Sequence, residues 1–279
     1  MNSPASNAQT KIEIIGGINT AYRQFGTGEP LLMVNRFRGV MDTWDPIFLD
    51  ALAAKHKIIL FDYPGIGASE GQLPSDINEV AAHIIHLADH LGLDQFNILG
   101  WSYGGLVTQT VTFLNPKRIK RTVLIGTNPP GNNAIPIEPA FFERALKPEN
   151  DLEDEYVLFF EPTSEKSRAA AKVSHDRIAM RLDRNMIPAT QELFQRYFAG
   201  SAVFREDKLN FREQYKNLQS PVLIISGDHD ISFATENWFP LLRNAPTMQH
   251  IILNDAGHGP QHQHPELAAG YINFFLSHS

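Results

Sequence analysis

The segment Gly100-Trp101-Ser102-Tyr103-Gly104 decides how the rest of the sequence is interpreted. It matches the pattern G-x-S-x-G and follows an apolar run, residues 96–99, which predicts a buried strand. A helical stretch then extends to Leu114. Glycines on both sides of Ser102 permit a tight turn, in which the serine adopts a strained backbone and stands exposed above the sheet. The five residues alone could be an ordinary Gly/Ser turn, but the strand and helix around them favour a nucleophile.

A serine hydroxyl is a weak nucleophile and needs a base that is itself oriented by an acid. Asp230 follows a predicted strand at residues 221–226, and His258 follows a predicted strand at residues 251–253. The order serine, acid, histidine, with each residue directly after a strand, predicts a catalytic triad. Asp228 is an alternative for the acid, and each of the two partners could instead be an ordinary loop residue.

Strand-like and helix-like patterns alternate along most of the 279 residues. Continuous apolar runs predict strands buried on both faces at residues 30–34, 57–61, 96–99, 121–126 and 221–227, and a further strand is predicted at residues 248–253. A hairpin is predicted at residues 11–15 and 18–25, and helices at residues 44–54, 75–91 (capped by Ser75) and 265–276. The alternation predicts an α/β fold with a mostly parallel central sheet and helices on both faces.

Residues 132–219 interrupt this alternation. They contain no convincing strand. Charged, helical patterns lie at residues 139–146, 153–160, 165–184, 189–198 and 204–215. A helical insertion after the sixth strand, before the sheet resumes, predicts a lid. We therefore expect one core formed by residues 1–131 and 220–279, with a helical cap at residues 132–219.

The composition excludes several functions. With 24 Lys and Arg against 31 Asp and Glu, the net charge of −7 is unlike that of a nucleic-acid-binding protein and would be repelled by an anionic membrane. The absence of cysteine excludes disulfides, thiolate metal sites and a cysteine nucleophile. The polar start, from Met1 to Thr10, is unlike a signal peptide, and no apolar run approaches the roughly 20 residues of a membrane helix. We expect a frayed N-terminal tail on a cytoplasmic protein.

The 11 histidines raise the question of a metal site. His83, His86 and His90 share one predicted helix, and the last two have the i, i+4 spacing of a zinc helix without the glutamate of H-E-x-x-H. They lie beside the apolar stripe, which favours a solvated face. His262 and His264 complete an H-x-x-x-H-x-H pattern with the proposed base, but they open a helix that turns them apart. We expect no metal and no cofactor.

Together these features resemble the α/β-hydrolase fold family, in its branch with a helical cap. The resemblance runs from about Ile18 to the C-terminus and is weak only over residues 132–219. The run Asp62-Tyr63-Pro64-Gly65-Ile66-Gly67-Ala68-Ser69 matches the D-x-x-G-x-G-x-S turn of the family. It is not a dinucleotide site, because Glu70 stands where the third glycine belongs and an extended loop follows.

The resemblance also implies where an oxyanion would bind. In the family, a loop of the type H-G-x-P supplies one backbone N–H, and the corresponding loop here is Val34-Asn35-Arg36-Phe37-Arg38-Gly39. Alignment implies the N–H groups of Phe37 and Tyr103 as the two donors, although Asn-Arg replaces the usual His-Gly. Arg36 and Arg38 could bind an anionic or polar substrate, or they could pair with carboxylates of the cap.

The residue at the nucleophile position restricts the reaction that the resemblance implies. Haloalkane dehalogenases and epoxide hydrolases of this family use aspartate there, whereas Ser102 implies hydrolysis of an ester, lactone or thioester, or carbon–carbon cleavage of a diketone. Cofactor-free perhydrolases share the triad, and proline iminopeptidases favour a G-G-S-W-G turn. The aromatic-rich cap indicates a bulky, apolar small molecule, and Trp101, Phe141 and Phe160 are candidate contacts.

Within the family, the loop at residues 34–39, the turn at residues 100–104 and the length of the cap resemble the serine-dependent macrolide esterases. That resemblance implies ring opening of a macrolide antibiotic lactone, and hence antibiotic resistance. The alternatives are a generic carboxylesterase, a small-lactone hydrolase, a perhydrolase, or a ligand receptor of the same fold with slow turnover. We expect a monomer or a homodimer.

Overall fold

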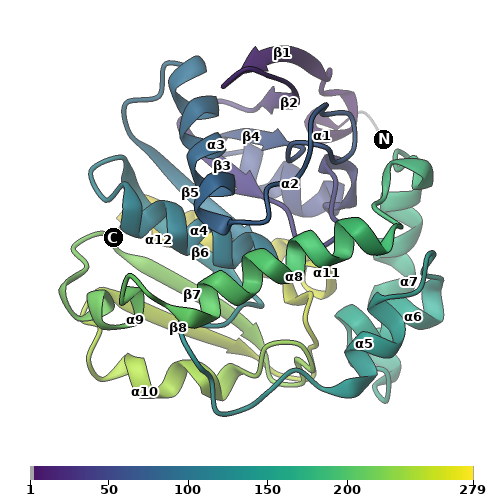
Figure 1. Cartoon of the computed structure of the whole chain (residues 1–279). Coiled ribbons are helices and arrows are strands. Elements are labelled where there is room, and N and C mark those ends of the chain that lie inside the picture. The colour runs from purple at the N-terminus through teal and green to yellow at the C-terminus, as the bar shows by residue number, and fades with distance from the viewer. Residues whose placement is uncertain (1–2, 279) are drawn as a thin grey trace.

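Within residues 3–278, which the computed structural model describes, one sheet of eight strands has the order β1-β2-β4-β3-β5-β6-β7-β8 (Figure 1). The strands are β1 (Lys11–Ile15), β2 (Ile18–Phe25), β3 (Glu29–Val34), β4 (His56–Phe61), β5 (Phe96–Trp101), β6 (Ile119–Ile125), β7 (Val222–Gly227) and β8 (Met248–Leu253). β1 and β2 form the expected hairpin, and β2 runs antiparallel to β4. The other pairs are parallel, so the carboxyl ends of β3, β5, β6, β7 and β8 meet at one edge.

Helices cover both faces of this sheet. α2 (Pro46–Ala53) and α12 (Pro265–His278) pack on one face, and α3 (Ile77–His90) and α4 (Tyr103–Leu114) pack on the other. Short elements complete the core: η1 (Met41–Thr43), η4 (Thr235–Trp238), α10 (Phe239–Leu242) and α11 (Pro260–Gln263). The predicted α/β architecture is confirmed.

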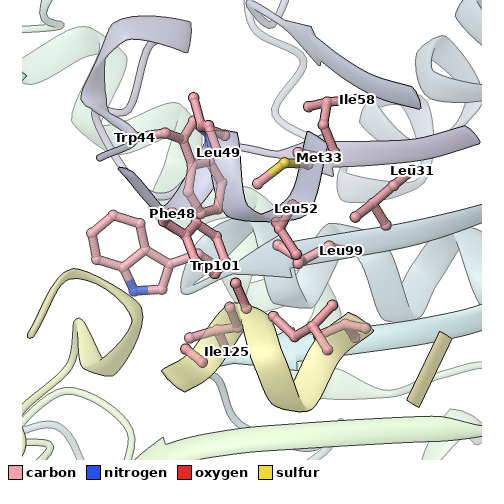
Figure 2. Close-up of a cluster of buried hydrophobic side chains, with 14 of the residues drawn as sticks. Leu31, Met33, Trp44, Phe48, Leu49, Leu52, Ile58, Leu99, Trp101 and Ile125 are labelled. Atoms are coloured by element: carbon pink, nitrogen blue, oxygen red, sulfur yellow. The ribbon is translucent and has the colours of Figure 1, made fainter. Parts of the chain in front are cut away.

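The central strands are apolar throughout because both of their faces are buried. In β3, Leu31 and Met33 face α2, whereas Leu32 and Val34 face the opposite cluster beneath α3 and α4. Figure 2 shows the first of these clusters, in which the side chains of β3 meet Phe48 and other residues of α2. This two-sided burial explains why β3 carries no alternation of polar and apolar residues.

Helix α3 differs from its prediction in two details. Its cap is Asp76, not Ser75, because the Asp76 carboxylate accepts the N–H of Asn78 at 2.8 Å. His83 does not lie on a solvated face: it is 5% exposed, and its Nε2 lies 3.0 Å from the Thr20 hydroxyl of β2. Position 83 follows Val80 by three residues, so it sits at the edge of the apolar stripe and is covered by the sheet.

The N-terminal segment is ordered from Ser3 onward, contrary to the expected frayed tail. Met1 and Asn2 of that predicted tail lie outside the described residues. Ser279, at the other end of the sequence, also lies outside them. α1 (Pro4–Asn7) is a short helix whose Ala5 N–H donates to Asp50 Oδ1 at 2.8 Å. The Arg181 guanidinium of the inserted segment donates to the carbonyl oxygens of Ala5, Ser6 and Ala8. The segment is therefore held between the core and the inserted helices.

Between β6 and β7 the structure contains helices only. They are α5 (Pro139–Ala145), α6 (Leu152–Phe159), α7 (Glu165–Ala179), η2 (Arg184–Met186), α8 (Gln191–Glu206), α9 (Phe211–Gln214) and η3 (Tyr215–Asn217). Figure 1 shows α5, α6 and α7 gathered at one side, with α8 crossing in front of the sheet.

The prediction of separate helices at residues 189–198 and 204–215 is wrong. α8 continues through that gap and ends only at Asp207, whose φ of 47° is left-handed. Gly200 lies at mid-helix because a Cβ there would stand 2.8 Å from the Tyr103 hydroxyl. The small residue therefore serves close packing of α8 on α4 and does not mark a loop. The predicted helix at residues 165–184 also ends earlier, at Ala179.

Each helix formed by residues 3–278 is too short or too polar to cross a membrane.

Burial of His83 makes a testable contribution to the pH dependence of stability. Burial lowers the pKa of His83 from its ordinary 6.5 to about 4. Between these pH values the unfolded chain binds a proton that the folded chain does not, so the free energy of unfolding falls as pH falls through this window. In His83→Gln the fall should be shallower by up to about 1.4 kcal/mol per pH unit, as measured by urea unfolding from pH 7 to pH 4.5.

His278→Gln, which removes an exposed histidine at the end of α12, is the matched control and should follow the wild-type slope. Equal slopes for His83→Gln and the wild type would contradict the burial of an uncharged imidazole.

Candidate active site

Ser102 occupies a strained turn between β5 and α4. Its backbone angles are φ 60° and ψ −123°, a region that L-residues rarely adopt. The surrounding hydrogen bonds hold it there: the Ser102 N–H donates to the Ile125 carbonyl at 2.9 Å, and its own carbonyl accepts the N–H of Gly105 at 2.8 Å. The side chain is thereby placed at the carboxyl edge of the sheet.

The glycines of the G-x-S-x-G segment are required by close packing. A Cβ on Gly100 would stand 2.2 Å from the Gly104 carbonyl oxygen, and one on Gly104 would stand 2.2 Å from the Val34 carbonyl oxygen. Helix α4 therefore begins in direct backbone contact with β5 and with the end of β3. Any larger residue at either position would separate the helix from the sheet.

Asp230 and His258, from the loops after β7 and β8, are directly hydrogen-bonded. His258 Nδ1 lies 2.8 Å from Asp230 Oδ2, and neither side chain is more than 1% exposed. The other carboxylate oxygen accepts the N–H groups of Ser232 and Phe233 at 2.8 and 2.9 Å. Because a carboxylate can only accept, the His258 proton resides on Nδ1 and leaves Nε2 as an acceptor.

The alternative acid, Asp228, has other partners. Its Oδ1 accepts from His229 Nδ1 at 2.7 Å and from the Ala256 N–H at 3.2 Å. These bonds fix the loop between β7 and the residues before His258, but the carboxylate does not pair with His258. Of the two candidates, Asp230 is the one that the structure brings to the histidine.

Two residues hold His258 in place: Gly126, which the sequence did not single out, and Trp101, which it singled out for another role. Gly126, directly after β6, has φ 47°, and a Cβ there would stand 2.6 Å from the His258 carbonyl oxygen and 3.4 Å from Asp230 Oδ2. The sequence did carry a sign of the role of Gly126, because a glycine directly after an apolar strand indicates a tight turn or a close backbone approach. The Trp101 indole N–H donates to the same His258 carbonyl at 2.8 Å.

The loop after β3 is held by Asn35. Its side-chain amide donates to the Phe61 carbonyl at 2.7 Å, and its Oδ1 accepts the Trp44 indole N–H, also at 2.7 Å. The next residues form a tight turn, closed by the Gly39 N–H on the Arg36 carbonyl at 2.9 Å. Asn35 thus fixes the path of this loop from inside the core.

This turn presents Phe37 beside Ser102. Phe37, Ser102 and Tyr103 line one cavity of about 520 Å³. Tyr103 is the first residue of α4, so its N–H has no acceptor within the helix. The Phe37 ring is held 5.1–5.5 Å from three rings of α8, those of Phe194, Tyr197 and Phe198.

This cavity, called the aromatic cavity below, is mainly apolar and is bounded by both the core and the inserted helices. Its other apolar lining residues are Leu106, Pro129, Ile135, Pro136, Ile137, Phe141, Phe142, Phe198, Ala202, Phe204 and Phe233. A volume of this size is typical of pockets that enclose a small organic molecule. Of the three predicted aromatic contacts, only Phe141 lies here.

The sequence profile described as alpha/beta hydrolase fold matches residues 29–265. The chain belongs to the α/β hydrolase fold family. The solved structure of an alpha/beta hydrolase fold protein from Chitinophaga pinensis is similar to it, with a TM-score of 0.89 and 26% identity, covering 99% of this chain and 100% of that chain.

Two curated relatives add sequence similarity. Over 239 residues, which are 81% of this chain and 79% of the relative, the sequence is 27% identical to 2-hydroxy-6-oxononadienedioate/2-hydroxy-6-oxononatrienedioate hydrolase 2 of Pseudomonas putida. Over 117 residues, 42% of this chain, it is 30% identical to polyketide synthase ThaQ of Burkholderia thailandensis, but it covers only 6% of that protein. Family membership and the first of these relatives support a hydrolase function.

In this α/β hydrolase, Trp101 and Phe160 are not on the cavity that Ser102, Phe37 and Phe141 line. They are 1% and 3% exposed, and both border a separate cavity of about 190 Å³ on the far side of Arg36. The Trp101 ring packs 4.7 Å from the His262 ring. The Trp101 indole N–H also holds the histidine loop, and a substrate contact of either residue stays a prediction.

Arg38 joins the core of the α/β hydrolase to its inserted helices. It is 3% exposed, and its guanidinium donates to the carbonyl oxygens of Ala145, Lys147, Pro148 and Pro188 and to Asn150 Oδ1. No carboxylate of residues 3–278 pairs with it, so the expected pairing of Arg38 with acidic residues of the inserted segment is wrong. Its donors are occupied by backbone carbonyls of the inserted segment.

The predicted solvated face holds for His86 and His90, which are exposed, but not for His83, and besides His258 two further histidines are buried as well. His56, His83 and His262 are at most 5% exposed. Burial lowers the pKa of His262 to about 4, so this imidazole is uncharged at neutral pH. Within residues 3–278, no group of three or more His, Asp or Glu is arranged to hold a metal ion.

Replacing Arg38 with Met should loosen the inserted helices. The variant loses five hydrogen bonds from the guanidinium while keeping most of the side-chain volume. We expect faster hydrogen–deuterium exchange at residues 145–150 and 188–190, and a loss of at least about 2 kcal/mol in the free energy of unfolding. Arg36→Met, which loses one bond to the Phe37 carbonyl, is the matched control. Unchanged exchange in Arg38→Met would show that these bonds do not hold the segment.

Proposed function

We propose that this α/β hydrolase cleaves a carboxylic ester or lactone through an acyl-enzyme intermediate. Ser102 is the nucleophile, His258 the general base and Asp230 the acid that orients it. The observation that carries the proposal is the buried 2.8 Å bond between His258 Nδ1 and Asp230 Oδ2, with Ser102 and His258 lining one small cavity. A strained serine beside an oriented imidazole is the arrangement that activates a hydroxyl.

In the first half of the reaction, Ser102 Oγ attacks the ester carbonyl carbon while its proton passes to His258 Nε2. The carbonyl oxygen becomes an oxyanion, which receives the N–H groups of Phe37 and Tyr103. Asp230 stabilises the imidazolium through its bond to Nδ1. The tetrahedral intermediate then collapses, the C–O bond to the alcohol breaks, and His258 gives its proton to the leaving oxygen.

In the second half, a water molecule attacks the acyl-enzyme, and His258 accepts its proton. Collapse of the second tetrahedral intermediate returns that proton to Ser102 Oγ and releases the acid. In a lactone the leaving alcohol remains tethered to the acyl group, so the product is one linear hydroxy acid. The mass gain is then that of one water molecule.

The inserted helices serve as the lid of this site. We assign residues 132–219 to a cap and residues 1–131 and 220–279 to the catalytic core. Support comes from the lining of the aromatic cavity, since Phe37 and Ser102 come from the core, whereas Phe141 and Phe198 come from the insertion. A lid of this kind excludes water from the oxyanion and strengthens its hydrogen bonds.

The substrate proposal is a macrocyclic lactone of the macrolide class, whose ring opening would confer antibiotic resistance. Two observations support it: the aromatic cavity of about 520 Å³ can take a bulky apolar group, and residues 34–39 and 100–104 resemble the macrolide esterases.

The roles of Asp230 and Ser102 are tested with three variants, two of them matched aspartate variants. Asp230→Asn should lower kcat on 4-nitrophenyl esters by about 10³- to 10⁴-fold, because the amide holds the wrong imidazole tautomer. Asp228→Asn, two residues away and paired with other groups, should keep most of the activity. Ser102→Ala should lower kcat on the same esters by about 10⁴-fold or more, and the variant should no longer react with a fluorophosphonate. Comparable losses for both asparagine variants would overturn the assignment of Asp230.

The macrolide proposal is tested by mass spectrometry. Incubation of the wild-type enzyme with macrolides of different ring size should yield a product heavier by one water, and Ser102→Ala should yield none. If the wild-type enzyme hydrolyses simple esters but no macrolide, the macrolide proposal is rejected and the protein is a carboxylesterase. Binding of a macrolide without any turnover, on macrolides or on esters, would favour a receptor.

A further inference from the structure

Arg36 is a cation without a carboxylate partner at the edge of the proposed active site. Its guanidinium carbon lies 4.6 Å from the centre of the Phe159 ring and 5.3 Å from that of Trp101. Nη1 donates to the neighbouring Phe37 carbonyl at 2.7 Å, whereas Nε is buried without a hydrogen-bond partner. Within residues 3–278, no carboxylate lies within 4.0 Å of this guanidinium.

The charges that face Arg36 do not neutralise it. Glu155 is the acid that acts on it most strongly, but its carboxylate is already 2.9 Å from His175 Nδ1. Arg38 adds repulsion, with its own donors occupied by the cap. Burial lowers the pKa of Arg36 to about 10, so it stays charged at neutral pH. A partly buried charge of this kind is stabilised by an anion that reaches it.

The position of Arg36 connects it to the nucleophile. Arg36, Ser102 and His258 line the same cavity of about 20 Å³. Arg36 also borders the cavity of about 190 Å³ beyond it, together with Phe159 and Asn150. The aromatic cavity opens from Ser102 without Arg36 among its lining residues. The serine therefore lies between an apolar region and a narrow region bounded by a guanidinium.

We propose that Arg36 forms a carboxylate-binding subsite next to Ser102. A guanidinium offers planar, paired donors that match the two oxygens of a carboxylate, and the rings of Trp101 and Phe159 hold its plane. The carboxylate can come from two sources: an anionic substituent on the substrate, or the acid that hydrolysis releases. This inference deepens the proposed function, and its substrate measurement rests on that function.

The first experiment compares two esters of similar length. Kinetics are measured on mono-4-nitrophenyl glutarate, which carries a carboxylate, and on 4-nitrophenyl pentanoate, which does not. The ratio of kcat/KM for the anionic over the neutral ester should fall by about 10- to 100-fold in Arg36→Met, and Arg36→Lys should restore part of it. Arg168→Met removes an exposed cation of α7 and should keep the wild-type ratio.

The second experiment measures binding without turnover. Isothermal titration calorimetry measures the affinity of glutarate and of pentanoate for the Ser102→Ala variant. Adding Arg36→Met to that variant should weaken these affinities about tenfold or more. Weaker binding with an unchanged ester ratio assigns the subsite to the released acid, and a changed ratio assigns it to a substrate substituent. If neither quantity changes, Arg36 is only a packing residue and the subsite is rejected. If no ester is hydrolysed by the wild type, the proposed function fails while the binding measurement still decides the subsite.

Discussion

The contact between the start of α4 and the carboxyl ends of β3 and β5 is the constraint on which the site depends. With Gly104 against the Val34 carbonyl and Gly100 against Gly104, the helix begins almost inside the sheet. The chain can make this turn only if Ser102 takes a strained conformation, which lifts its side chain out of the turn. The same contact places the loop after β3 beside the serine. One packing requirement thus brings together Ser102, the proposed nucleophile, and both proposed oxyanion donors.

The remaining groups reach this point because parallel strands end at a common edge. The loops after β6, β7 and β8 carry Gly126, Asp230 and His258. Asp230 and His258 are bonded to each other, and Gly126 packs closely against both. The Trp101 N–H binds the His258 carbonyl, so the residue before the serine also positions the histidine loop. Such support fixes the imidazole without a bond to the serine itself. The arrangement is preorganised, because its geometry rests on backbone and buried side chains.

Local pattern was sufficient to predict the strands, the turn at Ser102 and the order of the three candidate residues. Apolar runs mark strands buried on both faces, and glycines mark a turn that no other residue can make. Features set by distant partners could not be predicted. His83 stands at the edge of a helical stripe, where only Thr20 of β2 decides its burial. The continuity of α8 through Gly200 depends on the Tyr103 hydroxyl, which is far away in sequence. Arg38 binds backbone carbonyls, which every residue carries and no motif reveals.

Arg38 also explains how the inserted helices and the proposed oxyanion site act as one unit. Its backbone, with φ 59°, forms part of the turn that presents Phe37, while its guanidinium is bound to residues 145–150 and to Pro188. The inserted helices cannot move away at this end without pulling on that turn, and the turn cannot relax without breaking bonds to them. Arg36, two residues earlier, is kept beside Ser102 by the same turn. The position of the inserted helices, that of the Phe37 N–H and that of the Arg36 guanidinium are therefore coupled through four consecutive residues.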